Sequence, residues 1–312
     1  MRKSAKNRII VWSIVSCLLV AVLVLGIINV QNIGTFAMSP IQIGNVKNLD
    51  SYVTGEAEFD RAKVLSLDVN WAIGNVNISR GDSQKVMISE DVEAENVDDR
   101  MCWYIREDGT LSIYSSKRSS VFFGFSFNKN KAKTLNIEIP EDMSFDELHI
   151  SAASANVDVE FAIADKVIVE TASGNLDIND INADSVDITN VSGRINAVCK
   201  QVGEVSISSV SGKTNVSGNY RELDTETVSG ATEISVGKDV MSIDCDSVSG
   251  SIDLSVNKEI SGFKVKHESV NDSFECDFSG MAQVDEFVYG DKKTEIKLET
   301  VSGSMSVMKS SN

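Results

Sequence analysis

The segment Ser209-Val-Ser-Gly-Lys-Thr-Asn-Val216 decides the fold, because its pattern recurs along the second half of the chain. Each copy holds Val-Ser-Gly or a close variant, followed by alternating residues. The other copies are Thr171-Ala-Ser-Gly-Asn-Leu-Asp-Ile178, Asn190-Val-Ser-Gly-Arg-Ile-Asn-Ala197, Thr227-Val-Ser-Gly-Ala-Thr-Glu-Ile234, Ser247-Val-Ser-Gly-Ser-Ile-Asp-Leu254 and Thr300-Val-Ser-Gly-Ser-Met-Ser-Val307. Successive gaps of 19, 19, 18, 20 and 53 residues separate the corner glycines, which are Gly174, Gly193, Gly212, Gly230, Gly250 and Gly303.

The residues after each glycine alternate between apolar and polar, as Leu176, Asp177 and Ile178 do. Such a period of two indicates a strand with one face turned inward. A second short strand precedes each glycine, so one period holds about two strands and two corners. One such unit cannot bury its apolar face alone, whereas stacked units can. The sequence therefore predicts an all-β parallel β-solenoid with coils of about 19 residues.

Weaker copies extend the repeat in both directions. Ala155 lies 19 residues before Gly174, Asp272 lies in the long gap, and a more distant copy surrounds Gly74. We expect residues 61–312 to form the solenoid domain, with 151–312 as regular repeats and 61–150 as its N-terminal part or cap. Within 61–150, Asp108-Gly109 indicates a hairpin turn, and Leu135 to Pro140 a strand that the proline ends.

Residues Ile9–Ile28 contain no charged side chain and are long enough, at ~1.5 Å per residue, to cross a bilayer as a helix. Four basic residues precede this run and the next lysine is Lys47, so the positive-inside rule orients the chain. We expect a cytoplasmic tail (1–8), a transmembrane helix (9–29), a linker (30–60) and an extracytoplasmic domain. Two alternatives are a signal peptide cleaved near Ala37 and a lipid attached to Cys17.

The chain has 46 acidic and 29 basic residues in 312, a net charge of −17. Without the first eight residues, 25 basic residues face 46 acidic ones, so the rest carries −21. This charge argues against nucleic-acid binding, which needs lysine and arginine at phosphates. The two histidines, His149 and His267, have no arrangement typical of a catalytic triad. We expect no cofactor and no metal site.

Four cysteines follow the apolar run. Their spacing gives no disulfide framework and no C-x-x-C pair, so we expect mostly buried free thiols. Cys245 and Cys276 occupy repeat positions that are apolar in other copies and should face the core. The cysteines are Cys102, Cys199, Cys245 and Cys276.

The Val-Ser-Gly copies, together with Asp-Gly-Thr-Leu-Ser-Ile and Leu-Asn-Ile-Glu-Ile-Pro, resemble a bacterial β-strand-repeat adhesin family of unknown function, common in Firmicutes envelope proteins. The resemblance covers roughly residues 64–310. It implies an extracytoplasmic β-solenoid, often behind one membrane span, and some relatives are associated with envelope-stress systems. No catalytic residue is established for this family, so none is carried over.

Two features are candidate sites. Acidic residues share the third position after the corner, and these are Asp158, Asp177, Glu233, Asp253 and Glu275. This acidic row is either a solvated outer face, a cation-binding stripe or, least in keeping with the pattern, a carboxylate pair for glycoside hydrolysis. An aromatic and basic patch is either core or a contact loop for a protein, a membrane surface or a wall polymer. Its members are Phe122, Phe123, Phe125, Phe127, Lys129 and Lys131.

Our leading hypothesis is a non-enzymatic, membrane-anchored surface protein that binds or scaffolds an envelope protein, a wall polymer or a surface ligand. One alternative is an accessory of envelope-stress sensing, and a second is a carbohydrate-active enzyme.

Overall fold

The structure is a computed structural model that describes residues 52–91, 99–116, 121–122, 125–126, 132–270 and 273–310. These residues are almost entirely β-strand, with one short 3-10 helix, η2 (Arg61–Lys63). None of the described helical turns is long and apolar enough to cross a bilayer. The predicted transmembrane helix, 9–29, lies outside the described residues and remains a prediction.

The chain divides into two compact units between Asn179 and Asp180, each of which is described here by itself. The strands that begin in the N-terminal unit are β1 (Val53–Thr54), β2 (Ala57–Asp60), β3 (Ser66–Gly81), β4 (Lys85–Asp91), β5 (Cys102–Ile105), β6 (Thr110–Tyr114), β7 (Val121–Phe122), β8 (Phe125–Ser126), β9 (Lys133–Pro140), β10 (Phe145–Val159), β11 (Ala162–Ser173) and β12 (Leu176–Ser192).

The strands of the C-terminal unit follow in the same style. They are β13 (Ile195–Ser211), β14 (Thr214–Ser229), β15 (Thr232–Val236), β16 (Ser242–Ser249), β17 (Ile252–Val256), β18 (Gly262–Ser269), β19 (Phe274–Cys276), β20 (Met281–Gln283), β21 (Glu286–Gly290), β22 (Thr294–Ser302) and β23 (Met305–Lys309).

Parallel pairing at the repeat distance builds each coil. The first part of β10 pairs with β11, so that Leu148 lies beside Val167, and its last residues pair with β12, so that Val157 lies beside Leu176. Each coil therefore has two strand segments, one before the corner and one after it, and we call these segments its legs. The same pairing joins β13 to β14, with Ile195 beside Thr214. The expected all-β, solenoid-like architecture is confirmed.

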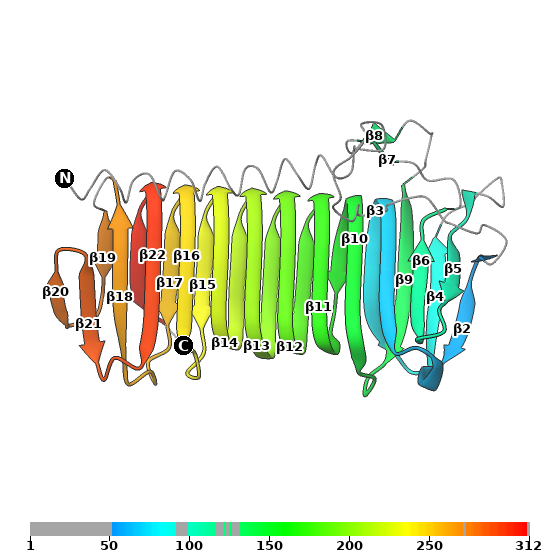
Figure 1. The fold of residues 1–312 in the computed structure, drawn as a ribbon, viewed down its shortest axis with the longest axis horizontal. Helices are drawn as coiled ribbons and strands as arrows, with labels where there is room; N and C mark the ends of the chain where they lie inside the picture. The colour runs from blue at the N-terminus through cyan, green and yellow to red at the C-terminus, as the bar shows by residue number, and fades with distance from the viewer. Residues whose placement is uncertain are drawn as a thin grey trace. The chain divides into compact units, whose positions relative to one another are not determined.

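The N-terminal unit does not stack its coils in chain order. Strand β3 lies between β10 on one side and the pair β6 and β9 on the other, and all of these pairings are parallel. Gly74 pairs with Ala155, so the distant copy around Gly74 stacks on the first copy of the regular repeat. Figure 1 shows β3 between β10 and β9. The chain thus forms the coil of β3 first, then the strands β6 and β9 on the outer side of β3, and then β10 on the other side of β3.

The C-terminal unit also stacks its strands out of chain order, at the long gap in the glycine spacing. Strands β22 and β23 pair with β16 and β17, so the 53-residue gap between Gly250 and Gly303 is a single coil step. Strand β18 pairs with the other edge of β22, and β19 with the other edge of β23. In Figure 1 the red strand β22 accordingly lies between the yellow β16 and the orange β18. The last coil in the sequence is not the last coil in space.

The core consists of the inward positions of the alternating pattern. On β10 the side chains of Leu148 and Ile150 are fully buried, whereas His149 between them faces outward and is partly exposed. Burying one such leucine or isoleucine stabilises the fold by about 1.5–3 kcal/mol. Trp71 is fully buried, and its indole N–H donates a hydrogen bond to the Lys133 carbonyl oxygen at 3.2 Å.

Three local expectations can be compared with the structure. Strands β5 and β6 form the antiparallel hairpin around Asp108-Gly109, and β9 ends at Pro140, as predicted. Residues 30–60 were expected to be a linker, yet β1 and β2 fall inside that range. Both are short edge strands that pair antiparallel with β5 and β4, and strands this short carry no periodicity that a sequence could reveal.

Candidate functional site

The aromatic and basic patch can be compared with the structure only in its backbone. Strand β7 pairs antiparallel with β8, which places Phe122 opposite Phe125 in a small hairpin. Phe123, Phe127, Lys129 and Lys131 lie outside the described residues. The patch therefore stays a prediction, both as core and as contact loop.

The corner glycines bring the backbones of adjacent coils into close contact. A Cβ atom added to Gly230 would lie 1.8 Å from the carbonyl oxygen of Gly212, and one added to Gly250 would lie 1.7 Å from that of Gly230. A backbone φ between 129° and 147° further favours glycine at Gly174, Gly193, Gly212 and Gly230. The glycines are thus needed to stack the coils, and they leave no space for a ligand at the corner.

The acidic row follows the leg after each corner. In the N-terminal unit Asp158 pairs with Asp177. In the C-terminal unit Asn215, Glu233 and Asp253 are successive partners in the same position, and Ser306 and Glu275 continue the row. Lys213 pairs with Glu233 at 2.6 Å, and the Ser306 hydroxyl donates to Asp253 at 2.7 Å. Serine, asparagine and lysine therefore interrupt the carboxylates in the C-terminal unit.

Metal binding finds no geometric support in the row or elsewhere on the described residues. Across those residues, no three His, Cys, Asp or Glu side chains gather as the ligands of one ion would.

A second polar face lies on the leg before the corner in the C-terminal unit. Asp224, Asp244 and Lys297 are register partners on β14, β16 and β22. The Lys297 Nζ lies 2.9 Å from Asp244 Oδ1, 3.3 Å from Asp246 Oδ1 and 3.4 Å from Glu299 Oε1. One ammonium group thus holds three carboxylates on two adjacent coils. We term these residues, with Asp224, the Lys297 face.

Burial, together with crowded negative charge, shifts the titration of two carboxyl groups on the Lys297 face. Burial, together with the charges of Asp244 and Glu299, raises the pKa of Asp246 to about 6, although Lys297 opposes this. Burial and the charge of Asp244 also raise the pKa of Asp224. Our sequence analysis missed this face because Asp246 and Lys297 are 51 residues apart. The corner glycines hold the signal that could have identified it: Asp244 stands six residues before Gly250, and its partner Lys297 stands six residues before Gly303.

Two shallow grooves open on these outer faces. One, of about 590 Å³, lies in the C-terminal unit, and its lining includes Lys266, His267, Glu268, Asp285, Glu286 and Glu299. The other, of about 440 Å³, lies in the N-terminal unit, and its lining includes Asp68, Arg106, Asp108, Asp146, Glu147 and His149. Both mix cations with carboxylates, which suits polar ligands.

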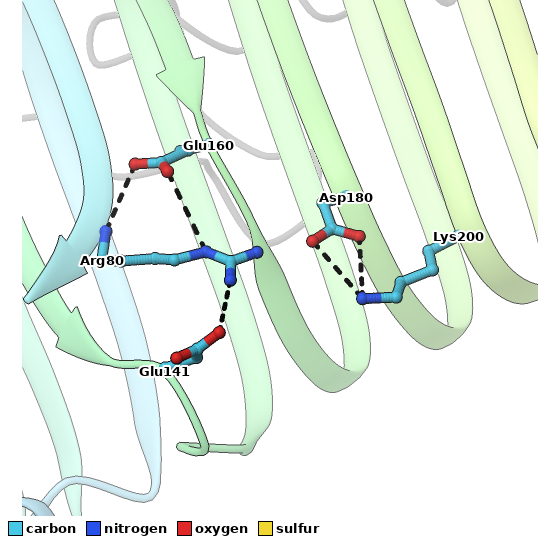
Figure 2. Close-up of polar contacts among 5 residues, drawn as sticks. All are labelled: Arg80, Glu141, Glu160, Asp180 and Lys200. Atoms are coloured by element: carbon cyan, nitrogen blue, oxygen red, sulfur yellow. Dashed lines mark hydrogen bonds and ion pairs between the residues drawn. The ribbon is translucent and has the colours of Figure 1, made fainter.

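Ion pairs also join the turns at the ends of the legs. In the N-terminal unit, Arg80 lies 2.6 Å from Glu141 and 3.9 Å from Glu160, whose carboxylate also accepts a hydrogen bond from the Arg80 backbone N–H (Figure 2). In the C-terminal unit, Lys200 lies 3.2 Å from Asp180. Exposed pairs of this kind contribute at most about 1 kcal/mol each to stability. We therefore interpret them as minor contacts that help to hold the turns in place.

The four cysteines in the described residues are free, and three are buried, in agreement with the expected free thiols. Burial raises the pKa of Cys199 and of Cys245 to about 12, which makes both thiols poor nucleophiles. Cys245 faces the core as expected. Cys276 is only half-buried, because β19 lies at the outer edge of β23 and pairs with no other strand of the described residues.

Comparison with protein families shows what class of protein this is. The model of the Toastrack family, DUF4097, matches residues 64–308. The chain therefore belongs to the Toastrack DUF4097 family, and the family resemblance indicated by the repeats is confirmed. Comparison with curated proteins found no match.

Comparison with solved structures found similar chains of low sequence identity. A candidate cell adhesion protein from Clostridium sporogenes is 14% identical, with 83% of this chain and 100% of that chain covered and a TM-score of 0.29. A candidate adhesin from Bacteroides fragilis is 12% identical, with 85% and 100% covered and a TM-score of 0.44. A candidate lipid-binding protein from Parabacteroides distasonis is 16% identical, with 85% and 99% covered and a TM-score of 0.45.

Proposed function

We propose that this protein is a non-enzymatic surface protein whose stacked coils bind or scaffold a partner outside the membrane. One observation carries the proposal, namely that parallel stacking places outward polar side chains in register on successive coils. Asp158 beside Asp177 is one such pair, and Glu233 beside Asp253 is another. Partner strands lie about 4.8 Å apart, so the side chains form regular rows.

A row of this kind suits an extended partner better than a compact small molecule. Each coil offers similar groups at similar spacing, so a polymer or an extended chain can make the same contact several times. Repeated weak contacts add through effective concentration. The net charge of −21 outside the first eight residues favours partners that carry positive charge or hydroxyl groups.

Membrane attachment is part of the proposal. The uncharged run Ile9–Ile28 and the basic residues before it support a single span with the N-terminus in the cytoplasm. The test is to treat intact cells and then broken cells with a protease that cannot cross the membrane. We expect loss of a C-terminal epitope in intact cells. Protection in intact cells and loss only after breakage would contradict the proposed orientation.

Binding is tested with the full chain in detergent and with isolated cell-wall material and envelope membranes. We expect the wild-type protein to sediment with one of these fractions, and the double variant Glu233→Gln, Asp253→Asn to lose at least half of that binding. The control is Lys200→Gln with Asp180→Asn, which removes one positive and one negative charge at a turn and leaves the row intact. Equal loss in both double variants would contradict a role for the row.

The same experiment separates the alternatives. Release of new sugar ends from the wall material would show a carbohydrate-active enzyme and overturn the non-enzymatic proposal. Crosslinking in membranes that captures only a membrane signalling protein, without binding to wall material, would favour the envelope-stress role.

A further inference from the structure

His149 occupies a charged position on the outer face of the N-terminal unit. Its register partner on β3 is Asp68, and its Nδ1 lies 3.7 Å from Asp68 Oδ1. On the opposite side, its Nε2 lies 3.7 Å from Glu170 Oε2 on β11. The imidazole ring thus lies between two carboxylates that come from the coils on either side of its own.

The row continues beyond Asp68 to the hairpin of β5 and β6. Arg106, beside the turn of this hairpin, places Nη2 2.8 Å from Asp68 Oδ2. The Ser112 hydroxyl donates to the same oxygen at 3.3 Å, and the Asn70 amide donates to Asp68 Oδ1 at 2.9 Å. Charges therefore alternate across four segments if His149 is protonated. The order is Arg106, Asp68, His149 and Glu170.

The protonation state of His149 decides whether this row is attractive throughout. The imidazolium form has an N–H on each nitrogen and can face both carboxylates. The neutral form has one N–H, so one nitrogen lone pair must face a carboxylate. Nε2 is buried and has no hydrogen-bond partner at the distance observed, which makes that mismatch costly.

Other charged groups around the ring leave the balance negative. Glu147 precedes His149 on β10 and has Lys166 on β11 as its register partner. Asp108 and Asp146 line the same groove as His149. Contact with Glu170 raises the pKa of His149; burial of the ring opposes this, and the charges of Asp68, Glu170 and Glu147 raise it further.

We propose that His149 is a proton-dependent clasp that, when charged, holds β3 and the β5–β6 hairpin against β10 and β11, and that loosens them when it loses its proton. The direction follows from linkage. A group whose pKa is higher in the folded than in the unfolded chain contributes its full stabilisation below the unfolded value, which is ~6.5 for histidine. That stabilisation is lost as the pH rises through the folded value. The N-terminal unit should therefore be firmest in mildly acidic surroundings.

The N-terminal unit carries its own optical probes. Trp71 and Trp103 belong to β3 and β5, which are two of the elements that the clasp joins, and the only other tryptophan is Trp12. The test uses the full chain in detergent with Trp12→Phe, and follows thermal unfolding by tryptophan emission at pH 5.5 and pH 8.0. We expect the midpoint to fall by about 2–4 °C between these values. In His149→Gln the fall should be absent.

Two controls separate His149 from the other groups that titrate in this range. His267→Gln removes the second histidine, which stacks on Phe274 at 4.0 Å in the C-terminal unit. Asp246→Asn removes the carboxyl whose pKa is about 6. Both variants should keep the wild-type fall in the tryptophan midpoint. Glu170→Gln, which leaves His149 in place, should reduce the fall by about half.

A direct measurement completes the test. Protein labelled only at histidine gives two Cε1–H ring resonances, and His267→Gln assigns them. The His149 resonance should titrate above pH 6.5, the ordinary midpoint for histidine, and Glu170→Gln should move it down. Titration of His149 at or below 6.5, or an unchanged fall of the tryptophan midpoint in His149→Gln, would overturn the clasp. Neither result depends on whether the protein binds a surface partner.

Discussion

Glycine at the corners allows a positive φ and a close approach of adjacent coils, and some positions need only one of the two. Gly230 has φ of 129°, and a Cβ atom there would also meet the Gly212 carbonyl oxygen. Gly250 lies outside the left-handed region and has only the close contact. Gly55 has φ of 92° and nothing within 4 Å of an added Cβ. The close approach of coils, rather than the turn alone, explains why the repeat retains glycine.

This separation predicts a smaller cost of alanine at Gly55 than at the two corner positions. Gly55→Ala should destabilise by about 1 kcal/mol, because only backbone strain is added. Gly250→Ala and Gly230→Ala should each cost about 3 kcal/mol or more, because the coils must also move apart. Chemical denaturation of the full chain in detergent, followed by circular dichroism, measures all three. If Gly250→Ala costs no more than Gly55→Ala, the coils are not in the close contact described.

Buried hydroxyl groups form a second residue-scale feature, three positions before the corner. Thr227 and Thr300 are buried, and neither hydroxyl has a hydrogen-bond partner among the described residues. Thr294 is also buried, but its hydroxyl donates to the Val240 carbonyl oxygen at 3.0 Å. The same side chain thus occurs in the core with and without a partner.

Valine substitutions should therefore have opposite effects at these positions. Thr227→Val should stabilise the protein by about 1 kcal/mol, because it removes an unpaired buried hydroxyl and keeps the shape. Thr294→Val should cost about 1 kcal/mol, because it leaves the Val240 carbonyl oxygen without its donor. Unfolding midpoints of the two variants provide the measurement. A loss of stability in Thr227→Val would mean that its hydroxyl is hydrogen-bonded in solution.

At the scale of elements, β22 and β23 are inserted between strands that precede them in the chain. Strand β22 pairs with β16 on one edge and β18 on the other. Removal of these last strands should therefore release β18 and β21 as well, although both lie earlier in the sequence. A chain that ends at Lys293 should become sensitive to protease within residues 262–290, and mass spectrometry of the fragments would locate the cuts.

A shorter truncation is the control for that prediction. A chain that ends at Met308 retains β22 and nearly all of β23, so residues 262–290 should stay protected. Protection in the chain that ends at Lys293 would contradict the expected release. It would mean that β18 replaces β22 beside β16, since all coils share the same alternation of apolar and polar residues.

The order of coils marks the limit of what the sequence predicted. Alternation around Gly74 and around Asp272 identified further copies, and the structure pairs Gly74 with Ala155 and Phe274 with Met305. Alternation says which face of a strand is buried, but every coil presents the same face, so it does not say which coil lies next to which. Edge strands such as β2 were missed because four residues are too few to show a period.

The same limit applies to the candidate sites. Glu170 stands two residues after Ile168, the register partner of His149, so the 19-residue repeat could have placed it near the ring. Asp68 stands six residues before Gly74, as His149 stands six before Ala155, but the sequence does not show that the copy around Gly74 stacks on the copy around Ala155. The rows of the outer faces were predictable only where the glycine spacing was regular.

At the scale of the whole molecule, stacked coils contact mainly their neighbours, so local destabilisation need not spread through the chain. Unfolding of the N-terminal unit can be followed by itself, because Trp71 and Trp103 lie in that unit and no tryptophan follows Trp103. Tryptophan emission then follows one unit, whereas circular dichroism follows the strands of both. This difference makes cooperativity between the units measurable.

Gly230→Ala in the Trp12→Phe background tests that cooperativity. If coils act as near neighbours only, circular dichroism should lose part of its amplitude at a temperature several degrees below the wild-type midpoint. The tryptophan transition should stay within about 2 °C of wild type, because the strain arises at Gly230 in the C-terminal unit. Leu148→Ala is the reciprocal variant, since it removes a fully buried side chain from β10 and should lower the tryptophan midpoint. If Gly230→Ala moves both transitions equally, then all the coils unfold together, and strain at one corner is felt throughout the molecule.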